Sequence, residues 1–183
     1  DIYVEFSKIH TEIHLELFEY GSIRAASLVN EEALDVSLVN MDFYDIDKMN
    51  SYTIDSDSFV FCISPEHPLA REKELTVEMI KNEPIMMYNT DSVQTNTLMG
   101  LFERHGIKPN IIMHASQLHT IRQFIAQRLG GAFLYKSVIR NLPDIVGIPM
   151  NPSIEQQIGL VWKKGIYINS SVEKFITYIQ NHC

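Results

Sequence analysis

The sequence predicts an α/β protein, because short apolar runs typical of strands alternate with amphipathic runs typical of helices. The 183 residues are 45% hydrophobic, which is enough to bury a substantial core. No repeat or low-complexity segment interrupts the alternation. Strands that alternate with helices in this way are typical of βαβ units, so we expect a largely parallel sheet.

Eight runs are predicted to be strands, either from alternation or from continuous apolar character. Residues 13–19 (IHLELFE) alternate and place Ile13, Leu15 and Leu17 on one side. Residues 59–63 (FVFCI) are apolar throughout, as in a strand buried on both faces. The others are residues 34–39, 85–88, 111–113, 132–135, 145–148 and 158–162.

Amphipathic stripes between the strands predict helices that bury one face. One should end at Gly106, with Pro109 beyond it. Another should begin at Ser116 and end at Gly130, and the last should open at Ser170, because Glu173 completes a capping-box spacing. The stripes are Leu98, Leu101 and Phe102; Leu118, Ile121, Ile125 and Leu129; and Val172, Phe175, Ile176 and Ile179.

The first ten residues also have helical spacing, with Ile2, Phe6 and Ile9 on one side. A βαβ unit begins with a strand, and this one begins with a helix. We therefore expect a strand and a loop upstream of Asp1.

Charge and composition argue against several classes of function. The 23 acidic residues outnumber the 15 Lys and Arg, giving a net charge of −8 that repels a phosphate backbone. We therefore expect no nucleic-acid binding by this piece alone. No run approaches the roughly 18 apolar residues of a membrane span, and the first residues lack the pattern of a signal peptide. Two cysteines, Cys62 and Cys183, make no disulfide framework and fit a reducing cytoplasm.

Cys62 lies inside an apolar run without a basic neighbour. It is expected to be a buried structural thiol, although a redox-sensing role stays an alternative.

Several motifs cover nearly the whole chain. They are IHLELFEYGS (13–22) with LDVSLV (34–39), SPEHPLA (64–70), LTVEMIKNEPIMMY (75–88), SQLHTIRQFIAQRLGGAFLY (116–135) and IGLVWKK (158–164). An apolar strand ends in Glu-x-Gly-Ser, a Leu-Asp strand follows, and a His-Pro-Leu-Ala turn comes next. In this order and at these spacings, the motifs resemble the effector-binding domain of LysR-type transcriptional regulators. The sequence departs from the usual pattern of that family at Arg128, where the family has Gly, and at Tyr135, where it has Pro.

The resemblance implies two Rossmann-like lobes in the manner of type II periplasmic binding proteins, each expected to have its own sheet. Lobe I would be residues 1–57 with 155–183, and lobe II residues 58–154. It also implies that a winged helix-turn-helix, a linker helix and the first strand of the domain precede Asp1.

The function implied is that of a ligand-sensing domain that binds a small-molecule co-inducer between two lobes. Such a domain is not an enzyme and needs no cofactor. Its partners would be the effector, a second copy of itself (a dimer, or a tetramer in the full-length parent) and DNA only through the missing helix-turn-helix; no membrane is expected. The alternative is a substrate-binding protein or a transferase on the same two-lobed fold.

Candidate effector contacts follow from a rule that needs no family knowledge: ligands sit beyond the carboxyl ends of parallel strands. Gly lets the backbone approach a ligand closely, and hydroxyl and amide groups supply hydrogen bonds. No Arg lies on these turns, so an anion would rely on helix N-termini. Helix capping is the alternative role for the serines. The candidates are Gly21, Ser22, Asn40, Thr90, Thr95, Ser116 and Gln117.

Signals for catalysis or metal binding are weak. His114 and His119 lie near one turn, but a metal usually needs three or four ligands and none join them there. Nucleophile-elbow, dinucleotide-binding and Walker A patterns are absent. Glu19 and Asp35 could form an acid/base pair, yet hydrogen bonding or exposure explains them equally well.

Overall fold

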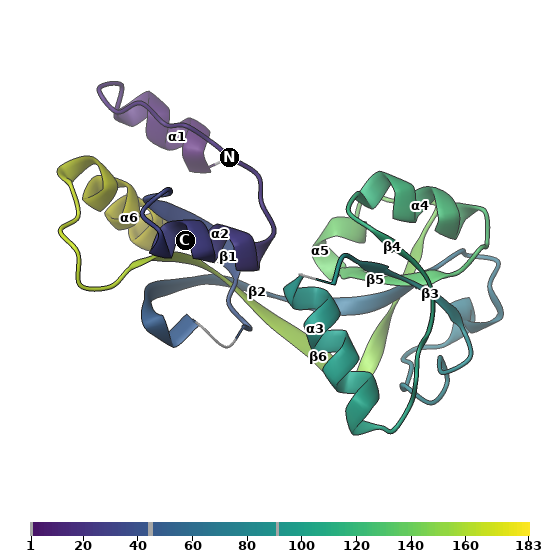
Figure 1. Cartoon of the computed structure of the whole chain (residues 1–183). Coiled ribbons are helices and arrows are strands. Elements are labelled where there is room, and N and C mark those ends of the chain that lie inside the picture. Colours follow the sequence, from purple (N-terminus) through teal and green to yellow (C-terminus); the bar gives the residue numbers. More distant parts are fainter. Residues whose placement is uncertain (1, 44–45, 91) are drawn as a thin grey trace. The chain divides into compact units, whose positions relative to one another are not determined.

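The computed structural model describes residues 2–43, 46–90 and 92–183. The chain forms two compact units: Asp1–Ser56 with Gln157–Cys183 (unit 1), and Asp57–Gln156 (unit 2). It passes from unit 1 to unit 2 within β2 (Met49–Ile63) and returns within β6 (Val146–Lys163), as Figure 1 shows. Helices and strands alternate along both units, which confirms the predicted α/β class.

In unit 2, helices cover both faces of the sheet. β3 (Pro84–Tyr88) pairs in parallel with β4 (Asn110–Ala115) and with β5 (Gly131–Tyr135). The end of β2 pairs antiparallel with β5, Phe59 opposite Tyr135. The helices are α3 (Val93–Arg104), α4 (Leu118–Ala126) and the short α5 (Lys136–Ile139), with a 3-10 turn at Pro68–Arg71.

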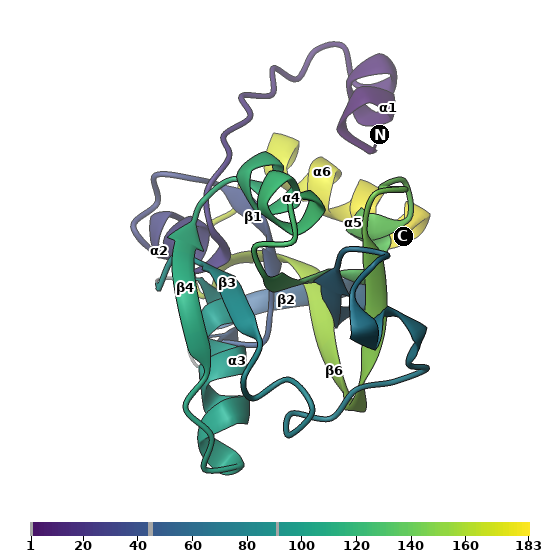
Figure 2. The ribbon, with the colours of Figure 1, turned by 90° about the vertical axis from the view of Figure 1, so that its right-hand side faces the viewer.

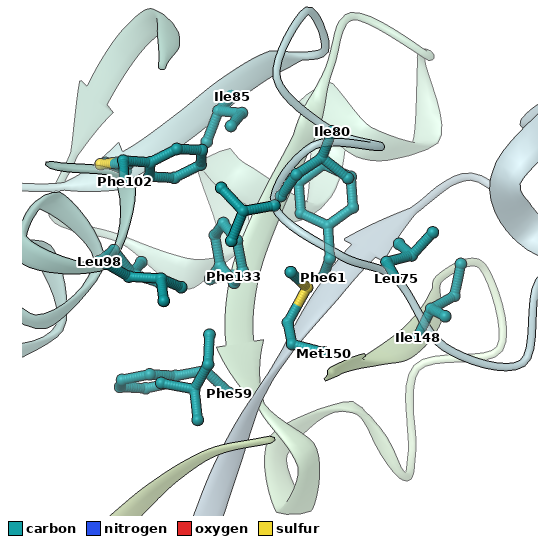
Figure 3. Close-up of a cluster of buried hydrophobic side chains, with 14 of the residues drawn as sticks. Phe59, Phe61, Leu75, Ile80, Ile85, Leu98, Phe102, Phe133, Ile148 and Met150 are labelled. Carbon is teal, nitrogen blue, oxygen red and sulfur yellow. The ribbon is translucent and has the colours of Figure 1, made fainter. Parts of the chain in front are cut away.

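Successive side chains of the strands in unit 2 point to opposite faces of the sheet, so its core has two parts, one on each face. Phe59 and Phe61 of β2 and Phe133 of β5 pack with Leu98 and Phe102 of α3, as Figure 3 shows. The residues between them on the strands pack against α4, and Figure 2 shows α3 and α4 on opposite sides of the sheet. This second cluster includes Val60, Cys62, Met86, Ile121, Ile125, Ala132 and Leu134. Burial on both faces is the reason these strands read as continuous apolar runs.

Unit 1 contains a smaller part of the sheet. β1 (Val36–Asn40) pairs antiparallel with the end of β6, Val36 opposite Trp162. One face packs against Ala25 and Ala26 of α2 (Ser22–Asn30). The other packs against Ile176 and Ile179 of α6 (Ser170–His182). The remaining elements are α1 (Ile2–Ile9) and a 3-10 turn at Ile46–Lys48.

Two expectations about the sheet are wrong. The hydrogen-bonding order of the strands is β1-β6-β2-β5-β3-β4, so the units do not have separate sheets. This follows because β2 and β6, with 15 and 18 residues, are long enough to pair within both units. The sheet is also mixed, not largely parallel. Parallel neighbours need a crossover connection, and only β3, β4 and β5 are joined by helices of this kind.

Residues 13–19, predicted to be a strand, form no strand in the structure. Residues 13–21 carry neither helix nor strand, and Leu17 and Phe18 are 64% and 59% exposed. Alternation predicts a strand only where a neighbouring strand offers hydrogen bonds. Among the described residues, none pairs with this segment.

Most helix ends were predicted to within one or two residues, but α4 ends at Ala126 and not at Gly130. Gly106, at a φ of +63°, follows α3 as expected. The cap of α6 is Asn169, whose Oδ1 accepts from the Ser171 and Val172 N–H groups, and not Ser170. Gln117, and not Ser116, holds the N-cap position of α4. Helices in the described ranges are too short or too polar to cross a membrane.

Arg128 explains one departure noted in the sequence. It follows α4 with a φ of +62°, a left-handed conformation that favours glycine. A glycine at this position would therefore be unstrained, whereas Arg128 adopts the conformation at a cost.

Candidate functional site

In unit 2, the candidate residues gather at one edge of the sheet. β3 and β4 run in parallel and end together, with Tyr88 opposite Ala115. The turns that follow bring Thr90 to the same edge as Ser116 and Gln117. All three side chains are exposed, and Gln117 makes no side-chain capping bond. Their polar groups are therefore available to a ligand at the carboxyl ends of these strands.

Thr95, the fourth candidate of unit 2, differs from these three because it is only 3% exposed. Its Oγ1 donates to the Tyr88 carbonyl at 2.9 Å and accepts from Ser92 Oγ at 2.9 Å. Ser92 also caps α3 by accepting from the Thr95 N–H. These bonds fix the turn between β3 and α3, so Thr95 positions its neighbours.

The Tyr88 carbonyl also joins the two turns. His114 Nδ1 on β4 lies 3.0 Å from this oxygen. Burial raises the pKa of the Tyr88 phenol, which stays a neutral hydrogen-bonding group near neutral pH.

Gln94 was missed in the sequence. It lies in the first turn of α3, is 8% exposed, and its Nε2 donates to the Phe133 carbonyl at 2.7 Å. A detectable signal existed, because Gln94, Leu98 and Leu101 follow the i, i+4, i+7 spacing of one helix face. A polar residue on a buried stripe at the end of a strand indicates a hydrogen-bonded position near the turn.

In unit 1, Ser22 and Asn40 are brought together. Ser22 Oγ accepts from the Asn40 backbone N–H at 3.0 Å, and Asn40 is 5% exposed. Asn40 Oδ1 accepts from the Asp42 N–H, and Asp42 Oδ2 accepts from the Gln157 N–H at 2.7 Å. The hydroxyl of Ser22 is therefore held at the carboxyl end of β1, and it does not cap α2.

Gly21 holds the N-cap position of α2 in extended backbone, with no side-chain cap. A Cβ added at Gly21 would meet no atom within 4 Å. Open space beside a helix N-terminus is compatible with the close approach of a ligand.

The weak sequence signals for a metal site, a reactive thiol and an acid/base pair can each be compared with the described part of the chain. No group of three or more His, Cys, Asp or Glu side chains there could hold a metal ion. Cys62 is fully buried, as expected, and burial raises its pKa to about 12. Glu19 and Asp35 are both exposed.

The sequence matches the family described as the LysR substrate binding domain over residues 2–183. The chain belongs to this family.

Curated relatives of the chain are transcriptional regulators. It is 27% identical over 181 residues to the uncharacterized HTH-type transcriptional regulator YwbI of Bacillus subtilis, covering 97% of this chain and 60% of YwbI. It is 23% identical to the malolactic fermentation system transcriptional activator of Lactococcus lactis, covering 91% of this chain and 58% of that protein. The chain thus spans about three fifths of the length of these relatives.

Solved structures show the same fold. The CcmR regulatory domain of Synechocystis PCC6803 in complex with 2-PG matches with a TM-score of 0.89 at 16% identity, covering 98% of this chain and 88% of that one. The effector binding domain of QuiR in complex with shikimate matches with a TM-score of 0.87 at 15% identity, covering 99% and 90%. This LysR domain therefore has the architecture of known effector-binding domains.

Proposed function

We propose that this chain senses a small-molecule effector for a LysR-type transcriptional regulator, with units 1 and 2 as the two lobes of the domain. The match to the LysR substrate binding domain over residues 2–183 carries the proposal. It is supported by similar structures that hold 2-PG and shikimate.

The effector we propose is small and polar. Its contacts would be Gly21, Ser22 and Asn40 in unit 1, with Thr90, Thr95, Ser116 and Gln117 in unit 2. Support comes from the turns after β3 and β4, which place Thr90, Ser116 and Gln117 at the carboxyl ends of these strands, and from Ser22, whose Oγ is bonded at the carboxyl end of β1. Of these, exposed Thr90, Ser116 and Gln117 would contact the ligand directly, and buried Thr95 would act through the turn.

The proposal also names the partners of the domain and the compartment in which it works. The domain pairs with a second copy, works in the cytoplasm and catalyses no reaction. DNA would be bound by a helix-turn-helix elsewhere in a longer protein, because the net charge of −8 repels DNA phosphates. A substrate-binding protein or a transferase on this fold is the alternative, and the curated relatives, which are regulators, favour the sensor.

A thermal-shift screen of carboxylates, amino acids, sugars and aromatics tests the proposal. A ligand at 100 times its Kd adds about 2.7 kcal/mol to the free energy of unfolding. Ser22→Ala and Ser116→Ala should each reduce this gain, because each removes a hydroxyl at a strand end. Ser7→Ala in α1 is the matched control, since the exposed Ser7 hydroxyl donates to the Tyr3 carbonyl of its own helix.

The expected result is a hit whose stabilisation is reduced by the first two variants and unchanged by the third. A hit that all three variants bind as well as the parent would contradict the assignment of the site. Conversion of a hit to a product would favour the transferase.

A further inference from the structure

The carboxyl end of β3 lies between β5 and β4 in the sheet of unit 2. β3 leads to α3, which packs on one face, whereas β4 leads to α4 on the opposite face, as Figure 2 shows. β5 leads to α5, and Ile139 of α5 packs on the same face as α4. Ligands bind beyond strand ends where neighbouring strands lead to opposite faces. Such a position therefore exists on each side of β3, and Ser116 and Gln117 belong to the one beside β4.

Gln94 belongs to the other position, between β3 and β5. The parallel ladder between these two strands ends with Met86 opposite Ala132. One residue further along β5, the Phe133 carbonyl accepts from Gln94 Nε2 at 2.7 Å. Because Gln94 lies in the first turn of α3, its side chain extends from the turn after β3 to the carboxyl half of β5.

The hydrogen bond to Phe133 determines which atom of the Gln94 amide remains free. A backbone carbonyl only accepts, so the amide nitrogen must face Phe133, and Oε1 is the other amide atom. Among the described residues, no group donates to Oε1. Every fully buried side-chain nitrogen or oxygen in this part of the chain has a partner. Oε1 is therefore reachable from outside the protein, although Gln94 is only 8% exposed.

An acceptor in such a setting is selective for donors. Oε1 has lost much of its hydration, so a ligand group placed against it is favourable only when that group donates a hydrogen bond. Carboxylate and phosphate oxygens only accept when they are ionised, and they would leave Oε1 unpaired. A site that hydrogen-bonds a hydroxyl rejects the analogue without it more strongly than an apolar pocket rejects a missing methylene.

We propose that Gln94 is a specificity-determining residue for the effector: its Oε1 accepts a hydrogen bond from a hydroxyl or N–H group of the ligand, beside the carboxyl end of β5. The inference rests on the proposed effector-binding function and names one feature of the ligand, a hydrogen-bond donor. Thr90, Ser116 and Gln117 can each donate and accept, so they impose no such restriction.

Probe pairs that differ by one donor group test the proposal on the whole 183-residue chain. The pairs are malate with succinate, lactate with propionate, and 3-hydroxybenzoate with benzoate; for any other hit from the thermal-shift screen, the analogue without the donor group is added. Calorimetric titration should give a Kd about tenfold lower for the member with the donor group. Gln94→Met should bring the two Kd values within about twofold of each other. A preference that survives in Gln94→Met would overturn the proposal, and so would a hit that has no hydroxyl or N–H group.

Gln94→Met also removes the donor to the Phe133 carbonyl, so an effect on the fold must be separated from an effect on ligand choice. A change in the fold lowers the affinity for both members of a pair, whereas loss of a ligand contact changes the ratio of their Kd values. Gln127→Met is the matched control, because Gln127 is exposed at the C-cap of α4. This variant should keep the ratio of the parent. A ratio lost in both variants would overturn the assignment to Gln94.

NMR of the side-chain amides gives a readout that needs no variant. The probe with the donor group should shift the side-chain amide nitrogen of Gln94 more than that of Gln127, because a bond to Oε1 polarises the amide. Backbone shifts at Ser116 and Gln117 with an unmoved Gln94 side chain would leave the proposed function standing and overturn this inference.

Discussion

Unit 2 buries its aromatic side chains in a closed core, whereas unit 1 leaves some of its own along an open groove of about 850 Å³, lined mainly by residues 12–20 and 33–38. In unit 2, Phe61, Phe102 and Phe133 are nearly or fully buried against one another. In unit 1, Phe18 and Tyr20 stack on each other while remaining 59% and 49% exposed. Aromatic side chains therefore form core in one unit and line an open groove in the other. The difference teaches that apolar side chains form a core only where other elements of the fold pack against them.

The largest expected effect compares one substitution in the two units. Phe133→Ala in unit 2 should lower the free energy of unfolding by about 3–5 kcal/mol, because it leaves a cavity among buried rings. Phe18→Ala in unit 1 should change it by less than about 0.5 kcal/mol, since this ring is mostly exposed. Urea unfolding measures both. A similar loss for the two variants would break the comparison.

A second pair of substitutions in unit 2 compares buried Thr95, which fixes a turn, with exposed Thr90, which we propose contacts the ligand. Thr95→Val removes the donor to the Tyr88 carbonyl and should cost about 1–2 kcal/mol of stability. Thr90→Val changes an exposed side chain and should leave stability within about 0.5 kcal/mol. Calorimetry of the unliganded variants checks this, and equal melting temperatures would show that the buried hydroxyl does not stabilise the turn.

A third effect should occur in both units. Glu32 after α2 and Arg128 after α4 each adopt a left-handed φ, of +60° and +62°. Replacing either by Gly should add up to about 1 kcal/mol, roughly 2–4 °C in melting temperature, because the steric cost disappears. Each residue also loses an exposed ion pair, Glu32 with Lys163 and Arg128 with Glu66, which contributes little. Arg128→Ala keeps the steric cost, so a gain from that variant would contradict the explanation.

The smallest effect concerns ion pairs. Hydrogen bonding from Lys174 on α6 lowers the pKa of Glu12 from 4.5 to about 2. A carboxyl with a lowered pKa stabilises the fold above its unfolded pKa. This contribution is lost as pH falls from about 4.5 toward about 2. Lys174→Met should return the NMR titration midpoint of Glu12 toward 4.5.

Unit 2 offers the counterpart to this pair. Arg122 hydrogen-bonds Asp144 and lowers its pKa. The midpoint of Asp144 should therefore not move in Lys174→Met. An unmoved Glu12 midpoint would show that Lys174 does not hold the start of the segment of residues 12–20.

The sequence predicted unit 2 better than unit 1, for a physical reason. β3 of unit 2 pairs with both β4 and β5, so the apolar runs of these strands have the hydrogen-bonding neighbours that a strand needs. The first half of β2 (MNSYTIDS) was not predicted to be a strand, because polar residues dominate it. It forms a strand because it hydrogen-bonds to neighbouring strands of the sheet. Residues 13–19 were overpredicted for the opposite reason: they have the pattern and no described partner.

The candidate site shows the same limit. The sequence predicted that Ser116 and Gln117 follow a strand, and they come directly after the end of β4. The burial of Thr95 was not predicted, because its contact with the Tyr88 carbonyl depends on how the turn folds back.

The most direct test of effector sensing is an NMR titration of the domain with a hit from the thermal-shift screen. The proposed function predicts the largest amide shifts at Gly21, Ser22 and Asn40 in unit 1 and at Thr90, Ser116 and Gln117 in unit 2. Shifts confined to residues 12–20 and 33–38, which line the groove of unit 1, would contradict the proposed site.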